Sequence, residues 1–293
     1  MKKVLPFLET MITYSCNLSC TGCTNYSDYT MKGYVSWEQG KTWLSNWLDR
    51  VDIPDFGIIG GEPLLCPDVN KWIVGCRELM PDTQIRFTTN ASLLTKKLSV
   101  FENLLDIGNS VIKISVHQPS EYYVQEALHY VFKSVKWTPV EEHGIKRWLG
   151  PKNVRLQINF PKTFIKSYKN KYHDMMPHNS LPSQAFDICV QKTCPLLYNE
   201  KLYKCSTSAL LKKVLQDWNR TEVIAWQPYL EYNGIDIHCN DSDLSNFIKG
   251  FGKPEQICRM CPSVKDTESN LIHIDNVIAK SEKKEFNGKT TIN

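Results

Sequence analysis

Stretches typical of β-strands alternate with stretches typical of α-helices over the first two-thirds of this 293-residue chain. The expected strands are Leu8–Tyr14, Asp55–Ile59, Gln84–Thr89, Val111–Val116 and Val154–Phe160, with a weaker sixth at Ala185–Val190. Amphipathic segments, expected as helices, lie between them at Ser36–Asp49, Asp68–Met80 and Glu121–Val135. Strands that alternate with helices pair in parallel through βαβ crossovers. The sequence therefore predicts an α/β fold.

Polar and apolar side chains alternate along three of these strands. In the fourth strand Lys113, Ser115 and His117 alternate with isoleucine and valine, and the third and fifth strands follow the same pattern. Successive side chains of a strand point to opposite faces, and a fully packed parallel sheet would be apolar on both. Three strands with one polar face predict a partial (β/α)6 TIM-like barrel with a wet, polar interior. An antiparallel sheet with one solvated face is the alternative.

Composition narrows the class of protein. No apolar run approaches the length of a membrane-spanning helix, and the apolar stretch before Glu9 is too short for a signal peptide. We therefore expect a cytoplasmic protein without a membrane partner. In that compartment eleven cysteines indicate metal binding rather than disulfides. The net charge of +4 does not by itself call for a nucleic-acid partner.

Three cysteines follow the first strand closely. Cys16, Cys20 and Cys23 are separated by three and then two residues, so their thiols can converge on one face of a short loop. Such a loop supplies three ligands to a [4Fe–4S] cluster, for which four thiolates are the norm. One iron then stays open to an exogenous molecule, as at a catalytic zinc. Half of a zinc ribbon and part of a disulfide network are the alternatives.

The segment Gly60-Gly61-Glu62-Pro63 follows the second expected strand. Together with the three-cysteine loop it resembles the radical S-adenosylmethionine (SAM) superfamily. The resemblance implies that this segment binds the amino group of SAM, since glycine lets backbone approach a ligand closely and a carboxylate complements an ammonium group. The family commonly has an aromatic residue where this chain has Gly22, so the adenine contact passes to Tyr26.

The same resemblance assigns further ligands at the ends of the polar strands. It places Thr88, Thr89, Asn90 and Ser115 at the ribose and carboxylate of SAM, with Gln157 and Asn159 as further candidates. His117 shares the face of Ser115 and is the candidate catalytic residue, as a substrate contact or a proton shuttle with a pKa near neutrality. A structural, hydrogen-bonded histidine is the alternative.

A second cysteine group lies toward the C-terminus. Cys194 and Cys205 flank an expected hairpin that turns at Asn199-Glu200, and Cys258 and Cys261 form a Cys-x-x-Cys unit. Four thiolates suit zinc or an iron–sulfur cluster equally. The arrangement resembles the twitch domain, a shortened SPASM domain, which implies an auxiliary [4Fe–4S] cluster. Cys189 and Cys239 are spare thiols that can replace one ligand, whereas Cys66 and Cys76 are expected in the core.

These assignments divide the chain into three parts. Residues 1–190 are expected to form the barrel, residues 191–265 the twitch-like domain, and residues 266–293 a polar tail. The insertion at residues 136–150 has no assigned role. The most basic local stretch, residues 162–173, is interpreted as a solvated face.

The resemblance implies an oxidoreductase, dehydrogenase-like enzyme, active as a monomer or dimer. It cleaves SAM to a 5′-deoxyadenosyl radical and removes hydrogen from a small polar substrate such as a sugar, cyclitol or nucleotide derivative. Its partners are that substrate and an external electron donor such as flavodoxin or ferredoxin. A peptide maturase is the alternative, although Met1–Glu9 is too short for a leader-binding domain. A non-catalytic zinc module that binds nucleic acid is the alternative of another class.

Overall fold

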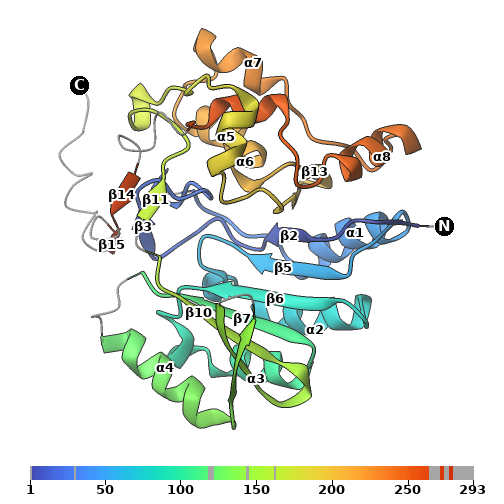
Figure 1. Cartoon of the computed structure of the whole chain (residues 1–293), viewed down its shortest axis with the longest axis vertical. Coiled ribbons are helices and arrows are strands. Elements are labelled where there is room, and N and C mark those ends of the chain that lie inside the picture. The colour runs from blue at the N-terminus through green and yellow to red at the C-terminus, as the bar shows by residue number, and fades with distance from the viewer. Residues whose placement is uncertain are drawn as a thin grey trace.

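A nine-stranded mixed sheet forms the centre of the protein, with strand order β13-β12-β2-β5-β6-β7-β10-β9-β8 (Figure 1). The structure is a computed structural model and describes residues 2–29, 31–117, 122–142, 145–161, 163–263, 271–273 and 277–279. The strands of the sheet are β2 (Leu8–Met11), β5 (Asp55–Ile59), β6 (Gln84–Thr89), β7 (Ser110–Ser115), β8 (Thr138–Glu142), β9 (Ile145–Leu149), β10 (Arg155–Asn159), β12 (Leu196–Tyr198) and β13 (Lys201–Tyr203).

Five strands have the same order in the sheet as in the chain. Strands β2, β5, β6, β7 and β10 pair in parallel in that order. The predicted α/β fold with a parallel partial barrel is confirmed. The sixth strand expected at Ala185–Val190 is wrong, because this segment contributes to helix α5 (Pro182–Ile188). The sixth parallel strand is β12, which pairs with β2 at the opposite edge from β10. The 136–150 insertion supplies the antiparallel strands β8 and β9.

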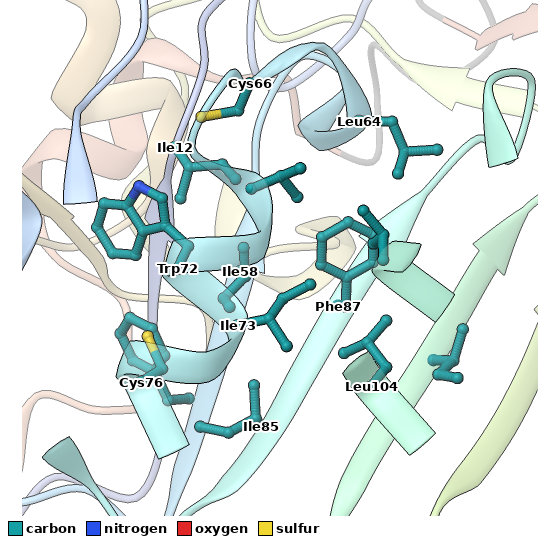
Figure 2. Close-up of a cluster of buried hydrophobic side chains, with 14 of the residues drawn as sticks. Ile12, Ile58, Leu64, Cys66, Trp72, Ile73, Cys76, Ile85, Phe87 and Leu104 are labelled. Carbon is teal, nitrogen blue, oxygen red and sulfur yellow. The ribbon is translucent and has the colours of Figure 1, made fainter. Parts of the chain in front are cut away.

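Helices cover the outer face of the parallel strands. They are α1 (Trp37–Leu48), α2 (Val69–Leu79), α3 (Leu98–Asp106) and α4 (Tyr122–Ser134). Helix α3 was not among the expected helices. Apolar side chains of the strands, including Ile58 and Phe87, are fully buried against these helices (Figure 2). Cys66 and Cys76 belong to this core with no exposed surface, as predicted.

Two glycine–tryptophan contacts lock α1 against α2. A Cβ on Gly75 would lie 2.2 Å from the ring of Trp37, and one on Gly40 would lie 1.9 Å from the ring of Trp72. The two indole rings also meet edge to face at 5.2 Å. Each glycine is therefore required because the opposite helix places an indole where a side chain would begin.

Residues 182–260 pack on the other side of β2 (Figure 1). Its helices are α5, α6 (Ser206–Asp217), α7 (Gln227–Leu230) and α8 (Asp241–Lys249). The β12–β13 hairpin turns at Asn199 and Glu200, which both have positive φ (46° and 66°) as a two-residue I′ turn requires. The predicted hairpin is therefore confirmed. A second core, which includes Tyr26, Leu210 and Trp226, joins the loop after β3 to α6.

Short strands complete the fold. They are β1 (Lys3–Val4), β3 (Leu18–Cys20), β4 (Val51–Asp52), β11 (Thr163–Ile165), β14 (Leu271–His273) and β15 (Val277–Ala279). The 3-10 turns are η1 (Ser27–Tyr29), η2 (Pro63–Leu65), η3 (Leu94–Lys96), η4 (Pro151–Asn153), η5 (Tyr172–Asp174), η6 (Ile224–Trp226) and η7 (Gln256–Met260).

The expected polar tail, residues 266–293, contains the two strands β14 and β15. Strand β14 pairs antiparallel with β11, and β15 pairs antiparallel with β3. The rest of that tail lies outside the described residues. Within the described part of the chain, no helix has the length and apolarity needed to cross a bilayer.

Candidate functional site

A cavity lies where the parallel strands β2, β5, β6 and β7 end. Ligands of open α/β sheets bind at this carboxyl edge of the strands. The cavity brings together most of the predicted site residues, namely Cys16, Cys20, Cys23, Gly60, Gly61, Glu62, Thr88, Thr89, Asn90, Ser115 and His117.

The three N-terminal thiols converge on this cavity. Cys16 and Cys20 are buried and Cys23 is half-buried. The loop closes tightly, because the amide of Cys23 donates to the carbonyl of Cys20 at 3.1 Å and Gly22 adopts a φ of 79°. Burial raises the pKa of the Cys20 thiol, and the neighbouring thiolates of Cys23 and Cys16 raise it further. The three sulfur atoms are thus close enough for their charges to act on one another.

The two glycines of the Gly60-Gly61-Glu62-Pro63 segment let the cysteine loop lie against it. A Cβ on Gly61 would lie 2.4 Å from the carbonyl oxygen of Ser15, and one on Gly60 would lie 2.8 Å from that of Thr13. The amide of Gly61 donates to the carbonyl of Thr13 and the amide of Glu62 to that of Ser15, each at 2.9 Å. The sequence predicted close approach of a ligand here, and the structure adds close approach of the cysteine loop.

Glu62 is held rigidly at the wall of the cavity. Its side chain is 1% exposed and accepts hydrogen bonds from Thr89 Oγ1 (2.6 Å), the Asn90 amide (2.7 Å) and the Leu64 amide (3.1 Å). Burial raises the pKa of Glu62 to about 7, and these donors act in the opposite direction. Two carboxylate oxygens offer about four acceptor positions, so one remains for a ligand. Pro63 opens the turn η2 and does not line the cavity.

A side-chain network that the sequence did not reveal holds Asn90. Its Nδ2 donates to Asn17 Oδ1 at 3.0 Å, and Asn17 Nδ2 donates to Ser92 Oγ at 2.7 Å. Ser92 belongs to the loop after β6 and Asn17 to the cysteine loop. These contacts join segments that are distant in the chain, so no local pattern signals them.

His117 lies beside Phe164 at the cavity. The two rings stack at 5.5 Å with an interplanar angle of 26°. Burial lowers the pKa of His117 to about 4, so the imidazole is neutral at pH 7. The expected pKa near neutrality is therefore corrected. Nδ1 of His117 is buried and has no hydrogen-bond partner among the described residues, whereas the structural alternative had assumed one.

Three predicted residues lie elsewhere. The Tyr26 ring is fully buried in the second core, where its hydroxyl donates to the carbonyl of Thr207 at 3.3 Å, so it does not line the cavity. Gln157 and Asn159 lie on β10 and hydrogen bond to each other at 3.0 Å rather than lining it. Leu18 and Phe164, which were not among the predicted site residues, contribute apolar surface to the cavity. Phe164 escaped prediction because nothing local distinguishes it from other apolar residues.

A second cavity lies between α5, α6 and η7, and four thiols line it. They belong to Cys189, Cys205, Cys258 and Cys261. Burial raises the pKa of Cys261, and the thiolates of the other three raise it further. Cys205 is the N-cap residue of α6, where the helix dipole favours a negative charge. The structure thus brings the spare thiol Cys189 into this group.

Cys194, which the sequence assigned to this group, does not line the second cavity. Burial raises its pKa to about 12, and its strongest charged neighbours are Glu9, which raises the pKa further, and Lys113, which lowers it. Lys204 lines the second cavity instead and is 7% exposed. The positive charge of Lys204 opposes the rise that burial causes in the pKa of Cys258. The Lys204 ammonium is held beside the thiols by Glu255, 3.4 Å away, and by the carbonyl of Gly250, to which it donates at 3.1 Å.

The donor sets of both cavities suit iron–sulfur clusters. None of the eleven cysteines, all of which the structure describes, forms a disulfide. Among the described residues no three His, Cys, Asp or Glu side chains lie close enough to hold a single metal ion. A cubane does not require that geometry, because each thiolate binds a different iron. Three converging thiols fit a cluster with one open iron, and four fit a closed one.

Part of the chain matches a protein-family model. Residues 10–138 match the model of the Radical SAM superfamily. Two curated relatives are the GTP 3′,8-cyclases of Campylobacter lari and Sulfurimonas denitrificans, 29% and 28% identical to this chain over 117 residues. The matched segment is 39% of this chain, and it spans about a third (35%) of each relative.

One solved structure matches almost the whole chain. The crystal structure of BtrN in complex with AdoMet and 2-DOIA superimposes with a TM-score of 0.50 and covers 95% of this chain and 100% of BtrN. At 17% sequence identity this likeness concerns the fold alone.

Proposed function

We propose that this chain cleaves SAM reductively and abstracts hydrogen from a small polar substrate, because residues 10–138 match the model of the Radical SAM superfamily. The observation that carries this proposal is one cavity that combines the three thiols of Cys16, Cys20 and Cys23 with the carboxylate of Glu62. When bound to the three thiols, the cluster supplies an open iron and the electron that breaks the sulfonium bond.

The side chains around the cavity have separate roles in this proposal. Glu62 accepts the ammonium group of SAM, and its three existing hydrogen bonds fix its carboxylate in advance. Thr88 and Ser115 face the hydroxyl and carboxylate groups of SAM. Phe164 offers a ring to the adenine, the role that the sequence gave to Tyr26. His117 takes no proton at neutral pH and acts as a hydrogen-bonding group toward substrate.

The second thiol group supports an oxidative outcome. We assign an auxiliary [4Fe–4S] cluster to Cys189, Cys205, Cys258 and Cys261, with Lys204 as the adjacent positive charge. Bound there, such a cluster would supply an acceptor for the one electron left on the substrate radical, and loss of a proton from that radical to solvent would complete a net two-electron oxidation. The initial electron comes from an external donor such as flavodoxin or ferredoxin.

A small polar substrate agrees with the barrel interior and with the relatives. Side chains of β6 and β7 on the inner face, such as Thr88 and Lys113, are polar and half-buried, so water reaches them. The curated relatives bear the name of a nucleotide cyclase, and BtrN was crystallised with AdoMet and 2-DOIA. These names support a small molecule of the sugar, cyclitol or nucleotide class.

Electron paramagnetic resonance tests the proposal directly. In anaerobically reconstituted, reduced protein, SAM should change the spectrum of the cluster because it binds the open iron. Cys20→Ala should remove this SAM-sensitive signal. Cys239→Ala, a matched control in neither thiol group, should retain it. A spectrum that ignores SAM, or a protein that binds zinc in place of iron, would contradict the proposal.

A further inference from the structure

The inner face of the parallel strands continues below the cavity. We call its central residues Glu9, Gly57, Arg86, Lys113 and Gln157 the lumen face. They alternate with residues such as Ile85 and Phe87 that are fully buried against the helices. Most of the lumen face is only half-buried, in contrast to a packed parallel sheet. These half-buried side chains of the lumen face therefore keep contact with solvent.

Glu9 is an unusual member of the lumen face. It lies on β2 next to Gly57 of β5 and is 7% exposed. A Cβ on Gly57 would lie 2.9 Å from the Cβ of Glu9, so glycine makes room for the acidic side chain. The carboxyl group of Glu9 has no hydrogen bond or ion pair with any residue that the structure describes. The carboxyl oxygens keep some contact with solvent, because they are not among the buried side-chain atoms that lack a hydrogen-bond partner. An unpaired carboxyl group that faces a polar interior is available to a ligand.

The cations of the lumen face do not neutralise Glu9. Arg86 is the register neighbour of Gly57, but its Nε donates to Asp55 at 2.6 Å, and its second contact is also with that carboxylate. Its guanidinium also lies over the ring of Phe7, 5.6 Å from the centroid. Arg86 is thus already paired.

Lys113 is the cation that acts on Glu9 electrostatically, yet the two groups form no ion pair within 4.0 Å. Lys113 likewise has no hydrogen-bond or ion-pair partner in the described part of the chain. It neighbours Thr88 in register, and Thr88 lines the cavity above. An acid and a base therefore face the same interior without touching, directly below the proposed SAM site.

We propose that Glu9 and Lys113 bind two ends of the substrate, Glu9 an ammonium group and Lys113 an oxygen acceptor such as a hydroxyl or carbonyl. This deepens the proposed function, on which it rests, and makes the substrate a small amine-bearing polyol. Burial raises the pKa of Glu9 to about 8, which Lys113 opposes only in part. An arriving ammonium group would supply the missing compensation. The neighbouring Cys194 thiol cannot supply this compensation, because burial raises its pKa and keeps it neutral.

Calorimetric titration of the reconstituted holoprotein with SAM bound tests this inference. Glucosamine and glucose serve as the probes, because they differ only by an amine in place of one hydroxyl. We expect glucosamine to bind at least tenfold more tightly than glucose. Glu9→Gln should abolish that preference, and Glu9→Asp, which keeps the charge, should retain part of it. Lys113→Met should weaken both sugars by a similar factor.

A matched control removes an exposed carboxylate. Asp52 lies on β4 and is exposed, so Asp52→Asn should leave the preference for glucosamine over glucose intact. Equal affinities for the two sugars, no binding of either at 10 millimolar, or an undiminished preference in Glu9→Gln would overturn the inference. Release of 5′-deoxyadenosine by the wild-type protein is measured in parallel. If 5′-deoxyadenosine is released but glucosamine and glucose bind equally well, only the proposed substrate class is wrong. If no 5′-deoxyadenosine is released, the proposed function fails.

Discussion

The Oγ of Ser206 donates a hydrogen bond of 3.3 Å to the carbonyl oxygen of Thr24. These residues directly follow Cys205 and Cys23, one from each thiol group. Thr24 lines both cavities, and Gln191 Nε2 donates to the same Ser206 hydroxyl at 2.5 Å. Thr207 Oγ1 donates to the same Thr24 carbonyl at 3.2 Å. A single loop residue, held by two hydroxyls of α6, therefore separates the two sites.

Removal of the Ser206 hydroxyl should destabilise the protein. In Ser206→Ala the buried amide of Gln191 loses its acceptor, and leaving a buried donor unsatisfied costs about 1–3 kcal/mol. We expect the free energy of unfolding, measured by urea titration of the apoprotein, to fall by that amount. Ser245→Ala is the control, because its hydroxyl is bonded on an exposed helix surface. Equal effects of both substitutions would show that the buried contact is unimportant.

Iron content distinguishes Cys189 from Cys194 as the fourth auxiliary ligand. Wild-type protein reconstituted anaerobically should hold about eight irons per chain, from two cubanes. Cys189→Ala should lower this to about four, because a cavity thiol is lost, whereas Cys194→Ala should stay near eight. The opposite result would restore the hairpin assignment that the sequence favoured. Zinc in either protein would argue against clusters altogether.

The glycine–tryptophan contacts make Gly75 resistant to substitution. Helix propensity alone predicts that Gly75→Ala would gain about 1 kcal/mol. The new Cβ would lie 2.2 Å from the Trp37 ring, and overpacking typically costs about 1–3 kcal/mol. At so short a distance the clash should outweigh the gain in helix propensity. We therefore expect the free energy of unfolding, measured with urea, to fall by a net amount on the order of 2 kcal/mol. In a Trp37→Leu background the same change should be neutral or stabilising.

Glu9 should make stability depend on pH. Its pKa is 4.5 unfolded and about 8 in the folded protein, where burial favours the protonated form. Below pH 4.5 both states carry the proton, so the group has no effect. As pH rises toward 8 only the unfolded state releases it, and stability falls, by an amount on the order of 5 kcal/mol at 1.36 kcal/mol per pKa unit.

Glu9→Gln cannot lose that proton. Urea unfolding should therefore show the variant close to wild type at pH 5 and clearly more stable at pH 9. A difference that is the same at both pH values would mean that the folded carboxyl titrates normally.

The parallel sheet was predictable because its signal is local. Polar and apolar residues alternate along β6 and β7, and turn or helix residues bound each strand. The wrong prediction of a strand at Ala185–Val190 has a physical cause. A short apolar run fits a strand or a buried helix equally well. Here Pro182 occupies the first helical position of α5, where its fixed φ favours the start of a helix.

The site was predictable where a motif carries it and not where the fold assembles it. Cys16, Cys20, Cys23 and Glu62 are identified by spacing and lie in one cavity. The choice between Cys189 and Cys194 depends on the path of the chain after α5, which no spacing encodes. The strand β15 likewise pairs with β3 across the length of the chain, beyond the reach of any local pattern.

Release of 5′-deoxyadenosine is the most direct test of the proposed activity. Reconstituted protein is incubated anaerobically with dithionite and SAM, and the nucleoside is quantified by chromatography. We predict that wild-type protein releases it, that Cys20→Ala releases none, and that Cys239→Ala matches wild type. Wild-type protein that carries its iron yet leaves SAM intact, or a Cys20→Ala variant as active as wild type, would contradict the account.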